Sequence, residues 1–524
     1  MSTQNKVPYP VVTIAIFFIA ISEFFQLAPL EAAHLSRRVV QTAGLELAWS
    51  THVAVDFSTS RLRHLTQHVS SQVHFHVHEI NVGKHKVLIS ERDVDPNGIP
   101  LGLEGAAKAA QRKVIAFQEA GWQPEHLEHN IPEITLYATT TQGVIHAIDA
   151  ETGRTLWSTT VGNPNYPTQK TAANDKFLAV INGSTLYLLE RDTGYIVWNH
   201  RLKSAPAAGA GLSDHLVSTI MKSGLVETYL LEDLEKHPWT FVSTGRGTSS
   251  PFATPRTFSW TTDRGHLYVG SAHEFEVYYR LEANTAFRSS PTALGNNRLF
   301  AAAQNGFVYA LDEMNGDLVW RHFAGQGIFQ PPVAVHQGVY VVAEGDLIRL
   351  DAKSGDEQWK APSIQQVVSI SHQRVYAIDD QSRLVVFDAK HGHQLAAASF
   401  PSLDVKFSNW QTDRLFVGTG TGTLYCLREP QLFLPQIHVG LENQGESSSV
   451  GGKSKGGSPS TDSKRTEDER KSSSATRVLE QPEPFGGSDS PEPFGDEDVG
   501  PEDPFGGNDE EDPFGFDNDD DPFG

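Results

Sequence analysis

The chain has 524 residues and a formal net charge of −22 at pH 7, with 42 Lys and Arg against 64 Asp and Glu. Residues 481–524 contain 16 acidic side chains and no Lys or Arg, so residues 1–440 carry only about −6. This distribution excludes the basic surface of a nucleic-acid-binding protein. The single cysteine, Cys426, excludes an intrachain disulfide and is interpreted as a small buried core residue.

The first 33 residues are predicted to be a signal peptide or an N-terminal anchor. Lys6 precedes a mostly apolar run at 11–21, which has the length of a signal-peptide core and falls short of the ~20 residues that span a bilayer. Ala32 and Ala33 follow as candidate cleavage points. We therefore expect export to the periplasm or cell envelope, with anchorage by the uncleaved segment as the alternative.

Residues 45–130 are predicted to form a small α+β module. Strands are expected at 45–57, 73–80 and 86–92. The sequence Asp95-Pro-Asn-Gly98 predicts a turn. One helix is expected at 104–120, ended by Gly121, because four apolar residues recur at helical spacing. These residues are Ala106, Ala110, Val114 and Phe117.

A different pattern repeats about every 40 residues within 131–432. Its clearest copy is Ala147-Ile-Asp149-Ala-Glu-Thr-Gly153-Arg-Thr-Leu-Trp157, where a strand leads into a turn and a second strand carries the Trp. Asp and Thr side chains can bond the turn backbone, and Gly supplies the positive φ. The predicted structural repeat comprises Asp149, Gly153, Trp157, Gly194, Trp198, Trp239, Asp312, Gly316, Trp320, Asp351, Gly355 and Trp359. A further copy ends at Gly392 with Ala396 in the Trp position.

The spacing of the turns predicts the number of copies. Successive turn glycines from Gly153 to Gly392 are 41, 122, 39 and 37 residues apart, so two degenerate copies are expected in the long interval. A last copy ends at Arg428 without its outer strand, which makes eight copies, with seven as the alternative. Four short strands per copy predict an all-β fold, an eight-bladed β-propeller of four-stranded blades. Residues 45–57, with Trp49, or residues 128–131 would supply the strand that closes the ring.

Residues 441–524 are predicted to be a disordered linker and acidic tail, because their composition is poor in apolar residues. Five acidic-Pro-Phe-Gly motifs recur in the tail at spacings of 9, 11, 9 and 9 residues. Their phenylalanines are Phe485, Phe494, Phe505, Phe514 and Phe523. Such motifs would bind a partner with a basic groove, with Phe as the anchor and several weak copies raising avidity. The alternative is a tail that serves only solubility.

The repeat A-x-D-x-x-T-G-x-x-x-W resembles the tryptophan-docking motif of the PQQ-like (quinoprotein-type) β-propeller family. This family includes quinoprotein alcohol dehydrogenases and the non-catalytic outer-membrane assembly lipoprotein BamB. The resemblance covers about 300 residues. The layout of module, propeller and acidic Pro-Phe-Gly tail also resembles BamB-like exported proteins of planctomycete-type bacteria. Each Trp is expected to pack between neighbouring blades and to donate its indole N–H to a backbone carbonyl.

The resemblance does not extend to the catalytic features of quinoprotein dehydrogenases. Those enzymes resemble one another in a Trp beneath the quinone, a catalytic Asp, a calcium site and commonly a disulfide between adjacent cysteines. A single cysteine makes that disulfide impossible here. Acidic residues such as Glu344, Asp379 and Asp380 are interpreted as turn formers or solvated side chains. We therefore predict no catalytic residue, no cofactor-binding residue and no cofactor.

Three histidines, His74, His76 and His78, alternate along one predicted strand and would share one face. Histidines in this arrangement can bind Zn²⁺ or Cu²⁺. No carboxylate or cysteine on that face stands at ligand spacing, so the three stay weak candidates and no metal site is predicted.

The sequence thus predicts a monomeric, non-enzymatic scaffold of the cell envelope, acting in outer-membrane protein assembly or a similar process. Its propeller faces would bind other envelope proteins. One alternative is an oxidoreductase that depends on PQQ and calcium. Another is a propeller that senses a small molecule in its central funnel.

Overall fold

The computed structural model describes residues 35–439, except for positions 57, 84, 296 and 401–403. The predicted signal peptide or anchor, the predicted tail and its five phenylalanines lie outside the described residues. The chain divides into the units Met1–Ser447 and Ser448–Gly524, and every described residue belongs to the first. Among the described residues, no helix combines the length and the apolar character needed to cross a membrane.

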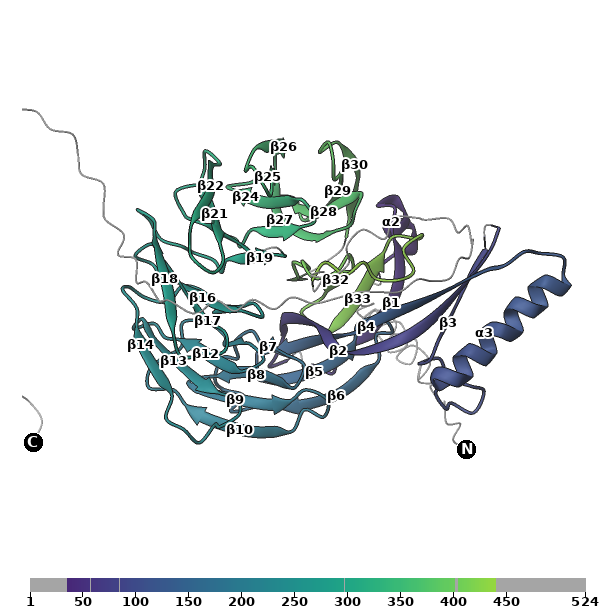
Figure 1. Cartoon of the computed structure of the whole chain (residues 1–524), viewed down its shortest axis with the longest axis horizontal. Coiled ribbons are helices and arrows are strands. Elements are labelled where there is room, and N and C mark those ends of the chain that lie inside the picture. Colours follow the sequence, from purple (N-terminus) through teal and green to yellow (C-terminus); the bar gives the residue numbers. More distant parts are fainter. Residues whose placement is uncertain (1–34, 57, 84, 296, 401–403, 440–524) are drawn as a thin grey trace, which may run out of the picture. The chain divides into compact units, whose positions relative to one another are not determined.

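Eight antiparallel sheets follow one another around a ring as the blades of a β-propeller (Figure 1). Blade 1 contains β2 (Leu62–Val82), β4 (Glu125–Thr140), β5 (Val144–Asp149) and β6 (Thr155–Thr160), with β3 (His85–Ser90) on the far half of β2. Blade 2 contains β7 (Ala172–Ala173), β8 (Phe177–Asn182), β9 (Thr185–Glu190) and β10 (Ile196–Arg201). Blade 3 contains β11 (Gly211–Leu212), β12 (Leu216–Ile220), β13 (Leu225–Leu230) and β14 (Trp239–Val242). Blade 4 contains β15 (Phe252–Ala253), β16 (Thr257–Thr261), β17 (His266–Ser271) and β18 (Val277–Glu282).

The second half of the ring continues the same order. Blade 5 contains β19 (Thr292–Leu294), β20 (Arg298–Ala302), β21 (Phe307–Asp312) and β22 (Leu318–Phe323). Blade 6 contains β23 (Val333–Val335), β24 (Gly338–Ala343), β25 (Asp346–Asp351) and β26 (Glu357–Ala361). Blade 7 contains β27 (Ile364–Ile370), β28 (Arg374–Asp379), β29 (Arg383–Asp388) and β30 (Gln394–Ser399). Blade 8 contains β31 (Val405–Lys406), β32 (Leu415–Gly418), β33 (Thr423–Arg428) and β1 (Glu46–His52).

The core lies between the blades. Strands β16 and β17 are buried along their whole length because neighbouring blades cover both faces of each sheet, whereas the outer strand β10 alternates exposed and partly buried residues. Apolar side chains of blades 5 and 6, such as Phe300 and Ile348, form one shared cluster. The eight-bladed prediction is confirmed, and blades 3 and 4 are the two degenerate copies expected in the long interval.

The ring closes through the N-terminal strand. Strand β1 pairs antiparallel with β33, and Trp49 lies opposite Cys426. Cys426 is buried together with Trp49 and Phe416 of blade 8 and with Leu136 of blade 1. The closing strand predicted at 45–57 is therefore confirmed. The alternative at 128–131 is wrong, since these residues lie within β4 and pair with β2.

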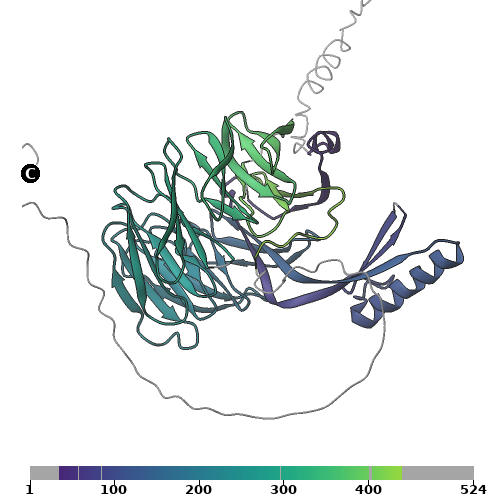
Figure 2. The ribbon, with the colours of Figure 1, turned by 45° about the horizontal axis from the view of Figure 1, so that its top comes forward.

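The predicted module boundary at 45–130 differs from the observed arrangement. Strand β1 belongs to blade 8, and residues 62–69 form the innermost strand of blade 1. After an irregularity between Val69 and His74, β2 continues out of the propeller in contact with β4. The part formed by residues 74–132 is called the arm below. It projects from blade 1 and carries α3 (Gly102–Glu119) (Figure 2).

The arm has the local features that its sequence predicts. Helix α3 buries Ala106 and Ala110 against Ile80 and other residues of the arm sheet, while Val114 and Phe117 pack partly buried beside them. The Asp95 side chain accepts hydrogen bonds from the backbone N–H groups of residues 97 and 99 at 2.8 and 2.9 Å, which fixes the predicted turn. A second helix, α2 (Arg37–Thr42), packs through Val40 into the apolar cluster of blades 7 and 8.

Candidate functional site

Most residues of the sequence repeat form joints between neighbouring blades. In one joint the indole Nε1 of Trp320 donates to the carbonyl oxygen of Ala352 at 3.1 Å. The indole ring lies against Gly355, where a Cβ atom would stand only 2.6 Å from the Trp320 Cδ2 atom. Only glycine leaves room for the ring at this point. The same joint recurs in three further pairs: Trp49 with Gly153, Trp157 with Gly194, and Trp359 with Gly392.

The Asp of the repeat shapes the turn on which the Trp lies. Asp351 accepts hydrogen bonds at one carboxylate oxygen from the backbone N–H groups of Lys353 and Ser354 at 2.9 and 3.0 Å. These bonds fix the conformation of the turn, and a carbonyl of the turn then accepts from the indole. In all four joints the accepting carbonyl belongs to the residue three positions before the turn glycine. Equivalent bonds occur at Asp149, Asp312 and Asp388.

Two of the predicted repeat tryptophans do not form this joint. Trp198 packs on His200 and Tyr229, and Trp239 stacks on Phe241 and Phe275. The blades that follow them lack the Asp-x-x-x-Gly turn, so no matching surface exists for the indole.

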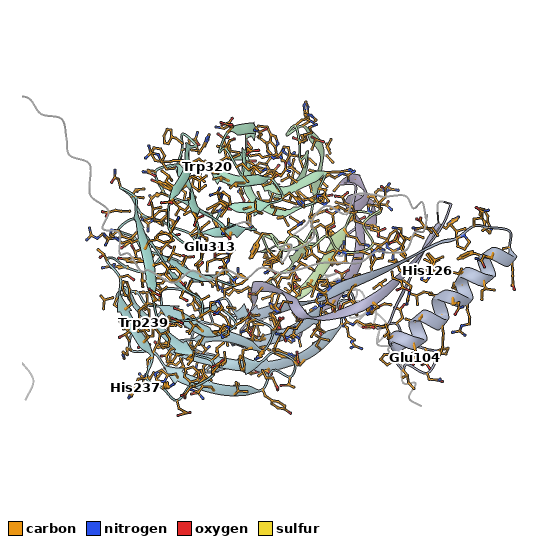
Figure 3. The ribbon with its side chains drawn as sticks, viewed as in Figure 1. Glu104, His126, His237, Trp239, Glu313 and Trp320 are labelled. Atoms are coloured by element: carbon orange, nitrogen blue, oxygen red, sulfur yellow. The ribbon has the colours of Figure 1, made fainter. Side chains whose placement is uncertain are left out.

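Gly316 receives a tyrosine in place of a tryptophan. The Tyr279 hydroxyl lies 3.2 Å from the carbonyl oxygens of Asp312 and Glu313, and its ring lies against Gly316. Figure 3 labels Glu313 and Trp320 on blade 5. The repeat residues are thus engaged in packing, and their chemistry is structural.

A buried ion pair holds the seam between blades 8 and 1. The Arg414 guanidinium donates to both oxygens of Glu151 at 3.2 and 3.1 Å and to the carbonyl oxygens of Leu432 and Phe433 at 3.0 and 2.8 Å. Only 1% of the Arg414 side chain is exposed. Burial raises the pKa of the adjacent Asp413 to about 6, although the charge of Arg414 opposes this shift. The sequence repeat contains no signal for this pair.

One of the three acidic candidates, Asp379, does not fit a PQQ and calcium site. Asp379 accepts hydrogen bonds from the backbone N–H groups of Gln381 and Arg383 and from the Arg383 side chain at 3.0, 2.7 and 2.7 Å. Its carboxylate is therefore used within a turn. Glu344 lines a cleft of about 360 Å³ with Phe329 and Gln365.

A larger cleft of about 920 Å³ lies among the turns of blades 3 and 4 and the connection to blade 5. Three arginines line it, Arg246, Arg264 and Arg288, together with Asp263 and Glu282. The backbone N–H of Arg246 donates to the Asp263 carboxylate at 2.7 Å. This internal bond occupies a backbone donor that an anion would otherwise use, so the turn does not form an open phosphate-binding nest.

The arm exposes apolar side chains, most of them on or next to α3. Six large apolar side chains of the arm are between 38% and 62% exposed. They are Val94, Ile99, Leu103, Ile115, Trp122 and Leu127. Leu127 lies opposite Glu79, on the face of the arm sheet away from α3, and the other five lie on α3 or in the segments that flank it. Exposed apolar side chains that gather on one surface mark contacts with other proteins.

The base of the arm is fixed to blade 2 by Asp175. At the irregularity of β2, the Asp175 carboxylate accepts hydrogen bonds from His68 Nε2 at 2.9 Å, from the Ser70 hydroxyl at 2.8 Å and from the Ser71 hydroxyl at 2.5 Å. Burial alone would raise the pKa of Asp175. The bonds from these three residues outweigh burial and hold the pKa far below its ordinary value of 3.8.

Replacement of Asp175 with asparagine is therefore expected to remove a pH-dependent part of the stability. A carboxyl group with a lowered folded-state pKa stabilises the fold above pH ~4 and loses that effect as the pH falls further. We expect Asp175→Asn to cost about 1–3 kcal/mol at pH 7. Urea unfolding should show a constant difference between the variant and wild type from pH 7 to about pH 4, and a smaller difference at pH 3. A difference that does not narrow below about pH 4 would contradict the assignment.

The three histidines of the predicted strand face do not meet at one point. His74 and His76 are exposed, whereas His78 is buried on the same face of β2. The register of β2 with β4 places Glu128 directly opposite His78, and His126 lies close by. Sequence spacing could not reveal that these side chains are neighbours, because His78 and His126 are 48 positions apart in the sequence.

Comparison with known proteins shows which family the propeller resembles. The model of the family described as outer membrane protein assembly factor BamB matches residues 110–226 and 257–405. The BamB of Yersinia pestis is 22% identical over 293 residues, which cover 52% of this chain and 66% of that protein. The quinohemoprotein alcohol dehydrogenase ADH-IIG of Pseudomonas putida is 28% identical over 163 residues, 29% of this chain and 21% of the enzyme.

Among solved structures, BamB from Moraxella catarrhalis aligns with a TM-score of 0.47 and 15% identity, covering 56% of this chain and 93% of that one. The match to the BamB of Yersinia pestis, at 66%, spans just under two thirds of the length of that protein. The family model covers just over half of the chain, in two segments that take in strands of seven blades. The chain belongs to the family of the outer membrane protein assembly factor BamB.

Proposed function

We propose that the protein is a non-catalytic scaffold that binds other proteins of the cell envelope and takes part in outer-membrane protein assembly. The observation that carries this proposal is the family match across both halves of the propeller. The use of the repeat residues supports it, because the Asp, Gly and Trp side chains that recur serve the joints between blades. Binding then depends on the features that differ between blades.

The arm is the clearest of these features and is proposed as the main docking element. It interrupts blade 1 between β2 and β4 and carries five exposed apolar side chains on α3 or in the segments that flank it, with Leu127 on the other face of its sheet. The Asp175 bonds hold its base, so the arm presents this surface in a defined direction. A rigid apolar surface lowers the entropic cost of binding a protein partner. The partner proposed here is an envelope protein with a complementary apolar surface.

Export to the periplasm or cell envelope completes this proposal, with or without anchorage by residues 1–33. The acidic motifs at Phe485, Phe494, Phe505, Phe514 and Phe523 are proposed as a second binding element for a partner with a basic groove. The protein itself is proposed to act as a monomer without a cofactor.

A comparison of the full chain with two variants tests the proposed docking element. Partners are recovered from solubilised envelopes with three proteins. These are the full chain, the double variant Leu103→Ser/Ile115→Ser and the control Leu395→Ser. Leu395 is a matched control because it is 54% exposed, as Leu103 is 56% exposed, but lies on blade 7. We expect the full chain and the control to recover outer-membrane assembly components, and the arm variant to lose at least about 90% of them.

A fourth protein, truncated at Leu441, separates the arm from the acidic tail. Loss of partners only on truncation would assign binding to the tail and contradict the role of the arm. Recovery of no assembly component by any of the four would contradict the scaffold proposal itself.

The second candidate function is a quinoprotein oxidoreductase, which the similarity to the Pseudomonas putida enzyme favours. The turn-bound Asp379 and the single buried Cys426 speak against it. Dye-linked alcohol oxidation after addition of PQQ and Ca²⁺ would establish this activity and replace the scaffold proposal.

A further inference from the structure

Three potential metal ligands converge on the arm. His78 lies on β2, and Glu128 and His126 lie on the adjacent strand β4. The His78 Nδ1 atom is 3.1 Å from His126 Nε2 and 3.5 Å from Glu128 Oε1. One ligand atom from each residue lies within 4.8 Å of the other two. In the described part of the chain this is the one such group of three (Figure 3 labels His126).

The strand pairing explains why these side chains meet. In the antiparallel register, His78 pairs with Glu128 and Ile80 pairs with His126, so all three polar side chains project from one face of the arm. Directly opposite and diagonal neighbours on one face of a sheet are within reach of long side chains. Pairing with β3 places Ile89 on the other side of His78, in the apolar cluster that α3 covers. The backbone of the arm therefore fixes the starting point of each ligand.

The distances suit a tetrahedral cation. Zinc binds imidazole nitrogen and carboxylate oxygen at about 2.0–2.1 Å, which puts neighbouring ligand atoms of a tetrahedron about 3.3 Å apart. The observed separations of 3.1 and 3.5 Å lie on either side of that value. Two histidines and one glutamate are a donor set that zinc uses in proteins with an open fourth position. Water would take this fourth position.

The state of His78 is a second, independent observation. Only 5% of its side chain is exposed, and the ring nitrogen that faces the other two ligands is Nδ1. This Nδ1 atom lies against a ring nitrogen of His126 rather than a backbone carbonyl. The Nε2 atom is buried without a hydrogen-bond partner among the described residues. A cation bound to the Nδ1 lone pair would replace the contact between the two ring nitrogens and leave the ring proton on Nε2.

The other two ligands give the ion a route from solvent. His126 is an exposed residue, and the Glu128 side chain is 71% exposed. The negative charge of Glu128 attracts a divalent cation to the mouth of the site, while the buried His78 forms its inner end. The exposed ligands also bind without any rearrangement of the apolar cluster under α3.

We propose that His78, His126 and Glu128 form a zinc-type metal site that joins β2 to β4 in the arm. The bound ion would hold the two strands together between the propeller and α3, where they project beyond the blades. This proposal does not depend on the proposed scaffold function, because it rests only on the ligand geometry of the arm.

Zinc titration of the untagged full chain, stripped with EDTA, tests the proposal. Isothermal titration calorimetry is expected to show one Zn²⁺ bound per chain, and Co²⁺ is expected to give the strong visible absorption of a four-coordinate site. His126→Ala and Glu128→Gln should each weaken binding at least about tenfold. Both replaced residues are exposed, so neither change disturbs the core.

His74→Ala is the matched control, because His74 is exposed on the same face of β2 but outside the group of three. Its zinc affinity should equal that of wild type. No uptake at micromolar Zn²⁺ would overturn the proposal. Equal binding by wild type, His126→Ala and Glu128→Gln would also overturn it, since the ion would then bind other histidines of the chain.

Discussion

Arg414→Ala is expected to destabilise the propeller by about 3–5 kcal/mol, because it leaves carboxylates at the seam without their buried partner. Arg414 donates to Glu151 across the junction of blades 8 and 1 and also bonds two carbonyl groups of the following segment. Removal of one member of a buried, hydrogen-bonded pair costs more than the pair contributes when intact. The midpoint of urea unfolding at pH 7 measures the effect.

Arg428→Ala is the control for this prediction. Arg428 of β33 contacts Glu46 of β1 at 2.7 Å within blade 8, but its side chain is 24% exposed and that of Glu46 is 35% exposed. A solvent-accessible pair of this kind is worth up to about 1 kcal/mol. Equal costs for the two variants would show that Arg414 does not hold the seam.

Gly355→Ala is expected to have the second large effect, a loss of about 3 kcal/mol or more. Gly355 has a φ of 78°, and an added Cβ would stand 2.6 Å from the Trp320 ring. The positive φ alone costs about 1–2 kcal/mol for alanine. The remainder comes from displacement of the indole and loss of its hydrogen bond to Ala352. Urea unfolding again provides the measurement.

Two comparisons separate the backbone cost from the clash. Gly325 has a φ of 83° and open space around its Cβ position, so Gly325→Ala should show the backbone cost alone. In a Trp320→Ala background the clash is absent, and Gly355→Ala should then cost no more than Gly325→Ala. Additive effects of Trp320→Ala and Gly355→Ala would contradict the proposed joint.

The sequence predicted the propeller well because its main determinant is local and repeated. An Asp-x-x-x-Gly turn followed by Trp specifies a strand pair and one joint, and the repeat period then gives the number of blades. Residues 45–57 were one of two candidates for the closing strand, and Trp49 favoured them because other outer strands also carry a Trp. Trp198 and Trp239 show the limit of this argument, since a joint also needs the matching turn on the next blade.

The remaining features depend on contacts between distant residues. Asp175 holds the polar segment around Ser70 as a bend within one long strand, so the predicted module at 45–130 includes residues that belong to the propeller. Arg414 and Glu151 are 263 residues apart and share no pattern. Glu128 became a neighbour of His78 only through the register of β2 with β4. Local spacing contains none of this information.

The pairing of β1 with β33 also sets the order in which the chain can fold. Glu46 lies opposite Arg428, so this pairing closes a loop of about 380 residues. Blades 1 to 7 are built from strands close in sequence and can form one after another as each finds its neighbour. Blade 8 needs both β1, which precedes the strands of the other seven blades in the sequence, and β31 to β33, which follow them. Folding of the ring is therefore expected to end at this blade, and until that moment β1 remains an unpaired strand exposed to other chains.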